Sequence, residues 1–299
     1  MQGKTKDEGC YMSLNGFSVY MKSAIKARLG RDYKVLVDDN SFANGVQVKK
    51  LDILEGDSDI SACIELNPFF QKYINDEFSL PELEQQIVDI YHRNKPPKCF
   101  ELDRSIMWNW NKAKQRIIFQ LVNKEKNKNL LLSTPHLEWN DLAIIFYFHF
   151  GELQNGRVRF LVEDYHLELW NKTVSDLWKE AEQNTPQLLP HQTLCVKGID
   201  EKGNLSFPMY ILTNRMMSDG AGCILYQGVL KEISDLMDGD LIIIPNSVDE
   251  TFIIKDPGNV DMEEFAFILR IVTQMDGKPE KFLSNKAYKY VRSLDKVIC

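Results

Sequence analysis

The stretch from Phe207 to Asp256 limits the fold of this chain more than any other part of the sequence. An apolar segment ends at Asn214, a segment with apolar residues at helical spacing follows, and two further apolar segments flank the turn Pro245–Glu250. Asn, Ser and Asp in that turn are residues that favour chain reversal. The pattern predicts strand, turn, helix, strand, tight turn and strand, and then a helix capped by Asp261. The apolar face expected for the first of these helices consists of Leu225, Val229, Ile233 and Leu236.

Residues 1–95 predict a separate N-terminal unit with the element order α-β-β-β-α-α. Its first helix begins after Ser13, which can cap the backbone, and stops at Gly30, while residues 1–11 form a loose polar tail. Its last helix begins after Ser79, with Glu82 placed to complete a capping box. The elements between them are strands over 33–38, 46–54 and 60–66 and a short helix that opens at Asn67.

The segment 94–98, NKPPK, predicts a linker, because its two prolines end a helix and favour extended backbone. The larger domain is then residues 99–299, and it contains a β-α-β-β-α unit over 207–275. Its other expected elements are a helix over 103–114, a loop over 133–141, a buried strand over 142–150, a hairpin turn at Asn155-Gly156, a returning strand over 158–162, a helix from Thr173 that ends near Pro186, and a surface loop over 187–206. Residues 116–123 fit either a strand or a continued helix. The fold class predicted by these elements is α+β, with short, mainly antiparallel sheets and packed helices.

The charge balance argues against nucleic acid as the partner. The chain of 299 residues has 36 basic and 43 acidic residues, a net charge of −7, so on average it repels a phosphate backbone. No apolar segment approaches the roughly 20 residues of a membrane-spanning helix, and the polar first residues do not form a signal peptide. The six cysteines form no CxxC pair and no cluster with histidine, which predicts free thiols in a reducing, cytoplasmic compartment.

Several segments carry a resemblance to a known family. They are DLAIIFYF, HLELWNKTVSDLWKEAEQNTPQLLP, PMYILTN, GAGCILYQGVL, DLIIIPNSVDE and LSNKAYKY. Across them, and in the N-terminal unit as well, the chain resembles the Firmicutes family called domain of unknown function fifty-six eighty-eight. Its C-terminal part has a more distant likeness to another uncharacterised bacillar family.

The resemblance implies a cytosolic protein that is often encoded on mobile elements, and it brings no assigned activity. The family's turn is similar to Pro-Ser-Ser-x-His-Glu, whereas this chain has Pro245-Asn-Ser-Val-Asp249-Glu250. A function that needs a histidine in this turn is therefore in doubt for this chain.

Two places in the sequence are candidates for catalysis. His136 lies near Glu138 and Asp141, a trio that can serve acid–base chemistry if it lines a cleft, although a turn explains the same residues. Cys223 follows Gly220-Ala-Gly222 at the expected start of a helix, where a thiol pKa can be lowered. A buried core thiol is the simpler interpretation, because apolar residues surround it. The glycines lack the spacing and the lysine of a phosphate-binding loop, and no histidines have metal-ligand spacing, so we expect no cofactor and no metal.

A set of polar residues at one edge of the C-terminal sheet is the candidate binding site. These residues are Asn214, Asp219, Asn246, Ser247, Asp249 and Glu250. If the strands that carry them are neighbours, their turns share a rim, where carboxylates and amides can hold a cation or a polar ligand. Turn and cap chemistry explains the same residues without any ligand.

The sequence thus favours a non-catalytic accessory or regulatory protein that binds an unidentified protein partner. This hypothesis follows from the lack of a complete catalytic or cofactor motif. The alternative is a hydrolase-like enzyme with a site around His136 or Cys223.

Overall fold

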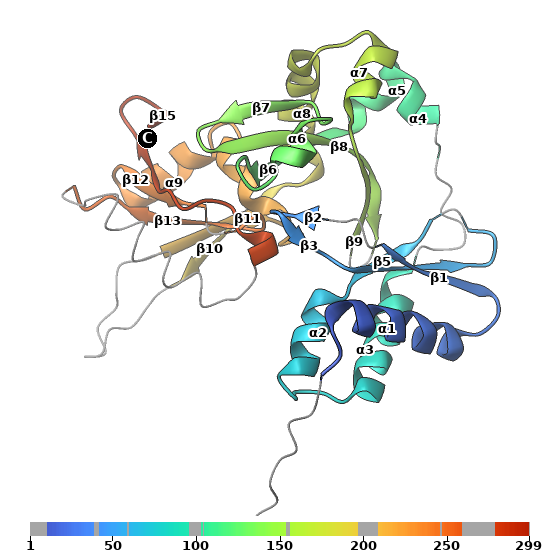
Figure 1. Cartoon of the computed structure of the whole chain (residues 1–299). Coiled ribbons are helices and arrows are strands. Elements are labelled where there is room, and N and C mark those ends of the chain that lie inside the picture. Colours follow the sequence, from blue (N-terminus) through green and yellow to red (C-terminus); the bar gives the residue numbers. More distant parts are fainter. Residues whose placement is uncertain are drawn as a thin grey trace, which may run out of the picture. The chain divides into compact units, whose positions relative to one another are not determined.

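The structure, a computed structural model, describes residues 11–38, 42–58, 60–95, 103, 105–153, 156–196, 209–245, 247–258 and 279–298. The chain divides into two compact units, residues 1–101 with 152–157 (unit 1) and residues 102–151 with 158–299 (unit 2). Both contain helices and antiparallel strand pairs, so the predicted α+β class is confirmed (Figure 1). Most of the predicted linker, Asn155 of the expected hairpin turn and the helix expected after Asp261 lie outside the described residues. Among the helices of these described ranges, none is both long enough and apolar enough to cross a membrane.

Unit 1 has the predicted helices and strands in the predicted order, with one further short strand, Phe42–Ala43, inside the turn expected before residue 46. Its elements are α1 (Leu14–Leu29), β1 (Tyr33–Asp38), β2 (Phe42–Ala43), β3 (Val46–Gln47), β4 (Lys50–Glu55), β5 (Ala62–Glu65), α2 (Asn67–Ile74) and α3 (Leu80–Asn94). The sheet has the order β1-β4-β5, and β2 pairs with β3. The strand expected over 46–54 is divided into β3 and β4. In Figure 1, α1, α2 and α3 lie on one side of the sheet.

The ends of the helices in unit 1 are fixed by the residues that the sequence indicated. The Ser13 side chain accepts a hydrogen bond from the Gly16 amide and so satisfies one of the free N–H groups at the start of α1. Gly30 ends the helix with φ of 97°, a conformation that favours glycine. Ser79 and Glu82 form the predicted capping box of α3.

The core of unit 1 lies between its sheet and its helices. Val35, Ile53 and Ala62 are neighbours across β1, β4 and β5, and all are buried. The helices cover this face with side chains at helical spacing, namely Phe17, Met21, Ile25, Leu83, Ile87 and Tyr91. Burial of this apolar surface is the main contribution to the stability of the unit.

Unit 2 is built on two sheets. The elements that precede the C-terminal sheet are α4 (Ser105–Trp108), α5 (Trp110–Ala113), η1 (Lys114–Arg116), β6 (Ile117–Asn123), α6 (Lys128–Leu131), β7 (His136–Trp139), β8 (Leu142–Leu153), β9 (Gly156–Leu161), α7 (Asp164–Trp170) and α8 (Val174–Leu188). The later ones are β10 (His191–Val196), β11 (Met209–Asn214), η2 (Gly220–Leu225), α9 (Val229–Met237), β12 (Leu241–Ile244), β13 (Thr251–Lys255), η3 (Pro279–Lys281), β14 (Tyr288–Val291) and β15 (Lys296–Ile298).

The central sheet has the order β6-β8-β7, with β9 also paired to β8, and the C-terminal sheet has the order β10-β11-β13-β12-β14-β15. The sequence of residues 116–123 fits either a strand or a helix. In the structure, Ile117–Asn123 is the strand β6, and every residue of this strand is buried. The segment η2 contacts β11 of the C-terminal sheet and β6 of the central sheet, and α8 packs on β6. Unit 2 therefore has a single layered core that includes both sheets.

Hydrogen bonds over long sequence distances tie the end of the chain to the central sheet. The Asn123 side chain donates to the Leu283 carbonyl, 160 positions away. Asp141 accepts from the Tyr288 hydroxyl, 147 positions away, and from Ser284. Trp139 contacts the Tyr288 ring edge-on, with centroids 5.0 Å apart. The C-terminal segment is therefore an integral part of the core of unit 2.

Two predicted helices are wrong in their extent, because single residues interrupt them. The helix expected over 103–114 is divided into α4 and α5 at Asn109, whose backbone is extended and whose side chain caps α5. The helix expected after Asn214 is divided into η2 and α9 by Gly228, which has φ of 82°. The register of α9 leaves Leu236 66% exposed, so the expectation that it faces the core is wrong.

Three loops or ends also differ from the prediction. His136–Trp139, expected within a loop, forms the strand β7 along β8. His191–Val196, expected within a surface loop, forms the edge strand β10 along β11. The helix α8 continues past Pro186 to Leu188. In the first two cases, pairing with a neighbouring strand supplies backbone hydrogen bonds that local sequence does not reveal.

His166 holds the start of α7 in place. Its Nδ1 accepts a hydrogen bond from the Glu163 amide at 3.0 Å, and the ring is buried between Tyr165, Phe148 and Trp170. Burial lowers the pKa of His166, although the charge of Glu163 acts in the opposite direction. The folded chain therefore favours the neutral imidazole, with its proton on Nε2.

This burial predicts a loss of stability in acid. The folded-state pKa lies below the unfolded value of about 6.5, so the unfolded chain binds the proton more readily, and stability falls as the pH drops below about 6.5. His166→Asn keeps an acceptor close to the position of Nδ1 and removes the titration. Urea unfolding at several pH values should show a smaller pH dependence for this variant than for the wild type. Equal slopes for the two proteins would contradict the assignment.

Candidate functional site

The strand order brings the polar turns of the C-terminal sheet to one edge. β13 pairs antiparallel with β11 through Leu212 and Thr251, and antiparallel with β12 through Ile244 and Phe252. The ends of β11 and β12 therefore meet the start of β13. The turn after Asn214 and the turn before Thr251 share this rim, as expected for neighbouring strands.

Asn214 shapes the first of these turns. Its side chain is buried, its Oδ1 accepts from the Met216 amide at 2.9 Å, and its Nδ2 donates to the Ser218 carbonyl at 2.8 Å. The turn leads to Asp219, which has φ of 53° and so adopts a left-handed conformation that Asp tolerates better than most residues. Asn214 thus places Asp219 beside the second turn.

Asp249 joins the two turns through its main chain and its side chain. Its carbonyl accepts from the Gly220 amide at 3.0 Å and from the Thr213 hydroxyl at 2.7 Å. Its Oδ1 accepts from the Asp219 amide at 3.0 Å, and its Oδ2 is paired with Lys281. Both carboxylate oxygens of Asp249 are therefore occupied by groups of the same chain.

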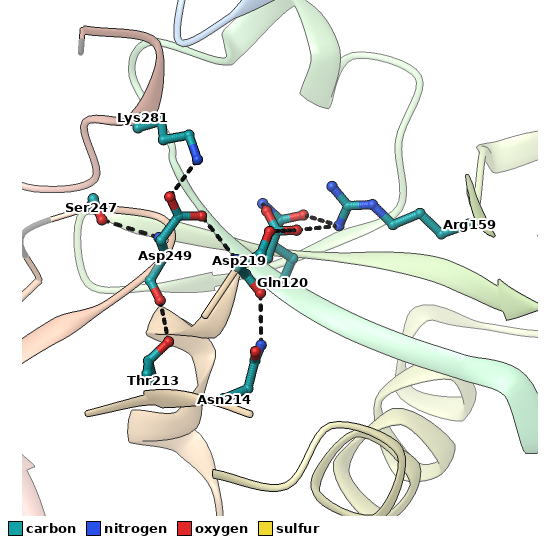
Figure 2. Close-up of polar contacts among 9 residues, drawn as sticks. Gln120, Arg159, Thr213, Asn214, Asp219, Ser247, Asp249 and Lys281 are labelled. Carbon is teal, nitrogen blue, oxygen red and sulfur yellow. Dashed lines mark hydrogen bonds and ion pairs between the residues drawn. The ribbon is translucent and has the colours of Figure 1, made fainter. Parts of the chain in front are cut away.

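Asp219 connects this rim to the central sheet. Its Oδ2 lies 3.0 Å from the Arg159 guanidinium on β9, and its Oδ1 accepts from Gln120 on β6 at 2.8 Å. Arg159 also donates to Gln120 Oε1 at 2.9 Å and lies over the Tyr147 ring. Figure 2 shows Gln120 and Arg159 reaching Asp219, which lies in the turn before η2. We call Gln120, Arg159, Asp219, Asp249 and Lys281 the polar cluster.

The charges of the polar cluster balance one another. Arg159 faces Asp219, and Lys281 faces Asp249. Burial by itself lowers the pKa of Arg159, but the charges of Asp219, Tyr147 and Asp249 and the hydrogen bond to Asp219 raise it above its ordinary value. Over the residues that the structure describes, no group of three or more His, Cys, Asp or Glu side chains is placed to hold a metal ion. The chemistry that this arrangement supports is the joining of two sheets by paired charges.

Ser247 and Glu250, two further predicted binding residues, form hydrogen bonds that shape the turn beside the polar cluster. Ser247 accepts from the Asp249 amide through its hydroxyl at 3.2 Å and donates its own amide to the Glu250 carbonyl. Both residues are partly buried. Asn246 lies outside the described residues. The structure thus brings Asn214, Asp219, Ser247, Asp249 and Glu250 to one rim.

Sequence reasoning missed Gln120, Arg159 and Lys281, because they lie far from the rim in the sequence. Only Gln120 carries a signal, since it is a polar residue within the apolar segment IIFQLVN, and such a residue needs a partner when buried. Nothing near Arg159 or Lys281 in the sequence distinguishes them from other surface cations.

The catalytic trio suggested by the sequence is not gathered at one point. His136 Nδ1 lies 2.8 Å from the Thr134 carbonyl, and Glu138, on the same strand, is paired with Lys124. The hydrogen bond from Lys124, and to a lesser extent the charge of His136, lower the pKa of Glu138. Asp141 lies beyond the other end of β7 and binds Ser284 and Tyr288. The strand β7 lies between His136 and Asp141. Because a strand rises about 3.3 Å per residue, its length keeps these two side chains apart.

Cys223 lies inside η2 and is fully buried. Burial raises the pKa of its thiol to about 12, although hydrogen bonds to Tyr226 and to its own backbone act in the opposite direction. Since the thiolate is the nucleophile, this environment suits a core thiol rather than a reactive one.

Thiol alkylation at neutral pH tests this environment. Cys195 is exposed and should react quickly, whereas Cys223 should react at least about a hundredfold more slowly until urea unfolds the chain. Mass spectrometry of peptides after timed treatment with iodoacetamide measures both rates. Similar rates in the folded protein would show that η2 opens readily and that Cys223 is accessible.

Comparison with known proteins finds one family. The model of a family of unknown function, DUF5688, matches residues 14–292. No curated protein and no solved structure matches the chain.

Proposed function

Because the chain belongs to DUF5688, a family of unknown function, we propose its function from the arrangement of its own side chains. The protein is a non-catalytic accessory or regulatory protein of the cytoplasm that acts by binding another protein. The mobile-element context that the family resemblance implies is part of the same proposal.

One observation carries this proposal. The carboxylates that could act as catalytic acids or bases near the predicted sites already bind groups of the same chain. Asp219 and Asp249 are paired with Arg159 and Lys281, and Asp141 accepts from two hydroxyl groups. A catalytic acid or nucleophile needs an oxygen or sulfur that can reach substrate. Side chains arranged in this way stabilise the fold and leave the surface to make contacts with a partner.

Affinity purification of the tagged, full-length chain from its native host tests the proposal. We expect a second protein to co-purify in a constant ratio at low salt and to be retained by His136→Ala and Cys223→Ser variants. Recovery of the chain alone at every salt concentration would overturn the proposal. Loss of the second protein in either variant would favour a role for that side chain in function.

One observation favours the alternative, a hydrolase-like enzyme. A carbonyl only accepts hydrogen bonds, so His136 Nδ1 carries the proton that is donated to Thr134, and Nε2 of the neutral ring is the basic nitrogen. The ring is only partly buried, and it lies near the Glu138 carboxylate. A panel of ester and phosphoester substrates, tested with the wild type and His136→Ala, separates the two proposals. Hydrolysis by the wild type that disappears in the variant would establish the enzyme.

A further inference from the structure

An exposed aromatic and aliphatic surface lies where α4 meets α7. Trp108, Tyr165 and Leu169 are 57%, 47% and 50% exposed, respectively. The Trp170 indole donates to the Met107 carbonyl at 3.0 Å, which fixes α4 against the C-terminal end of α7. Trp108 is the next residue after Met107, and Leu169 is the residue before Trp170. The backbones of Trp108 and Leu169 therefore lie next to the two residues that this hydrogen bond joins. We call Trp108, Asp164, Tyr165, Glu168 and Leu169 the α7 surface.

The α7 surface rests on a rigid base. On the inner side of α7, the buried rings of His166 and Trp170 contact Phe148 of β8 edge-on. Tyr165 stacks on His166 with ring centroids 3.9 Å apart. Its aromatic ring is thus already held by packing and loses little freedom when a partner covers it. Rigid, half-exposed aromatic side chains of this kind are typical anchors of protein interfaces.

The charge of this surface indicates what covers it. Asp164 and Glu168 lie on the same exposed side of α7 as Tyr165 and Leu169, and Glu163 at the start of the helix is also exposed. Two lysines of neighbouring segments are held in other contacts, Lys112 in an ion pair with Asp103 and Lys172 over the Trp110 ring. The apolar side chains are therefore bordered by negative charge, which favours a basic partner and disfavours an acidic one.

The spacing of the apolar side chains indicates the shape of the partner. Tyr165 and Leu169 are four residues apart on a helix, so they form a short ridge. Such a ridge packs into the groove between side chains of a second helix. A helix whose own apolar residues recur at positions three and four apart, with lysine or arginine at its borders, meets both the ridge and the acidic border.

We propose that the α7 surface binds a basic, amphipathic α-helix of a partner protein. This inference rests on the proposed function and specifies where and by what chemistry the binding takes place. Tyr165, Leu169 and Trp108 contact the apolar side of the incoming helix, and Asp164 and Glu168 face its basic border.

A synthetic peptide of about 18 leucine and lysine residues, arranged with one apolar face, is the probe. Fluorescence anisotropy with the full-length chain should show saturable binding, whereas a scrambled peptide of the same composition should bind much more weakly.

The double variant Tyr165→Ser/Leu169→Ser should weaken binding by about tenfold or more, because two anchors are lost. The double variant Asp164→Lys/Glu168→Lys should weaken binding by a similar factor and reduce its salt dependence. Asp164, Glu168 and Leu169 are exposed, whereas Tyr165 also stacks on His166, so the affinities are compared only after circular dichroism and urea unfolding show that each variant is folded like the wild type.

The matched control is Leu236→Ser on α9, because Leu236 is more exposed than Leu169 but has no part in the α7 surface. It should leave the affinity for the peptide unchanged. No binding of the amphipathic peptide, equal binding of the scrambled one, or equal effects of the control and the α7 variants would overturn the inference. Binding of the chain to phosphatidylcholine vesicles that is lost in Tyr165→Ser/Leu169→Ser would assign the surface to a membrane and overturn it as well.

Purification from the host separates this inference from the proposed function. If the wild type retains a protein partner and both α7 variants retain it equally, the partner binds elsewhere, and only the inference fails. If the wild type retains no partner, the proposed function fails, whatever the peptide does.

Discussion

Gly220→Ala should lower the free energy of unfolding of unit 2 by about 3 kcal/mol, as expected for forcing atoms into a filled space. A Cβ atom at this position would lie 2.3 Å from Thr213 Oγ1, 2.5 Å from the Asn214 amide nitrogen and 2.7 Å from the Asp249 carbonyl oxygen. Two of these atoms are backbone atoms, so they cannot move aside without breaking the rim of the C-terminal sheet. The variant must therefore disrupt the contacts between Gly220 and Asp249.

Tryptophan fluorescence during urea unfolding measures this effect, because all five tryptophans lie in unit 2. Gly222→Ala is the matched control in the same 3₁₀ segment. There the new Cβ would lie 3.1 Å from a ring atom of Phe119, and a side chain can adjust. We expect a loss of about 1 kcal/mol or less for the control. Equal losses for the two variants would show that the close packing around Gly220 is not the cause.

Asp219→Asn should lower the stability of unit 2 by about 2–3 kcal/mol, because it removes the charge that faces Arg159. The Asp219 side chain is only 12% exposed and that of Arg159 28% exposed, so solvent screens the remaining charge incompletely. Asparagine tolerates the left-handed backbone at this position and keeps an oxygen for Gln120. The loss therefore measures the charge pair rather than the turn.

A double-mutant cycle with Arg159→Met tests this explanation. Methionine keeps part of the aliphatic stem over Tyr147 and removes the guanidinium. If the two charges stabilise each other, the double variant should lose about 1–3 kcal/mol less than the sum of the single losses. Strictly additive losses would show that Asp219 and Arg159 act independently, and that the polar cluster does not join the sheets through this pair.

Local signals in the sequence predicted the parts of the fold that depend on a few neighbouring residues. Ser13, Gly30 and the Ser79–Glu82 pair lie where the capping rules place them, because each satisfies groups within one turn of its own helix. The interruptions at Asn109 and Gly228 were missed, since the apolar spacing continues through them and the periodicity gives no warning. The edge strands β7 and β10 were missed because their partners, and not their own residues, hold them extended.

The candidate site could be predicted only in part for the same reason. Asn214 and Asp249 lie in turns rich in Asn, Ser and Asp, and the pairing of β11 with β13 brings these turns together. Arg159 and Gln120 reach Asp219 only because the central sheet packs against η2, a contact that no local pattern describes.

The hydrogen bonds from Asn123 to Leu283 and from Tyr288 to Asp141 have a consequence for synthesis in the cell. Translation delivers the central sheet long before the segment that completes it has left the ribosome. During that interval the side chains of Asn123 and Asp141 lack the partners that they have in the finished protein, and apolar surface beside them stays uncovered. Unit 2 should therefore reach its native state only after residues 283–288 have left the ribosome, and it should depend on chaperones more than unit 1, most of which is encoded before unit 2.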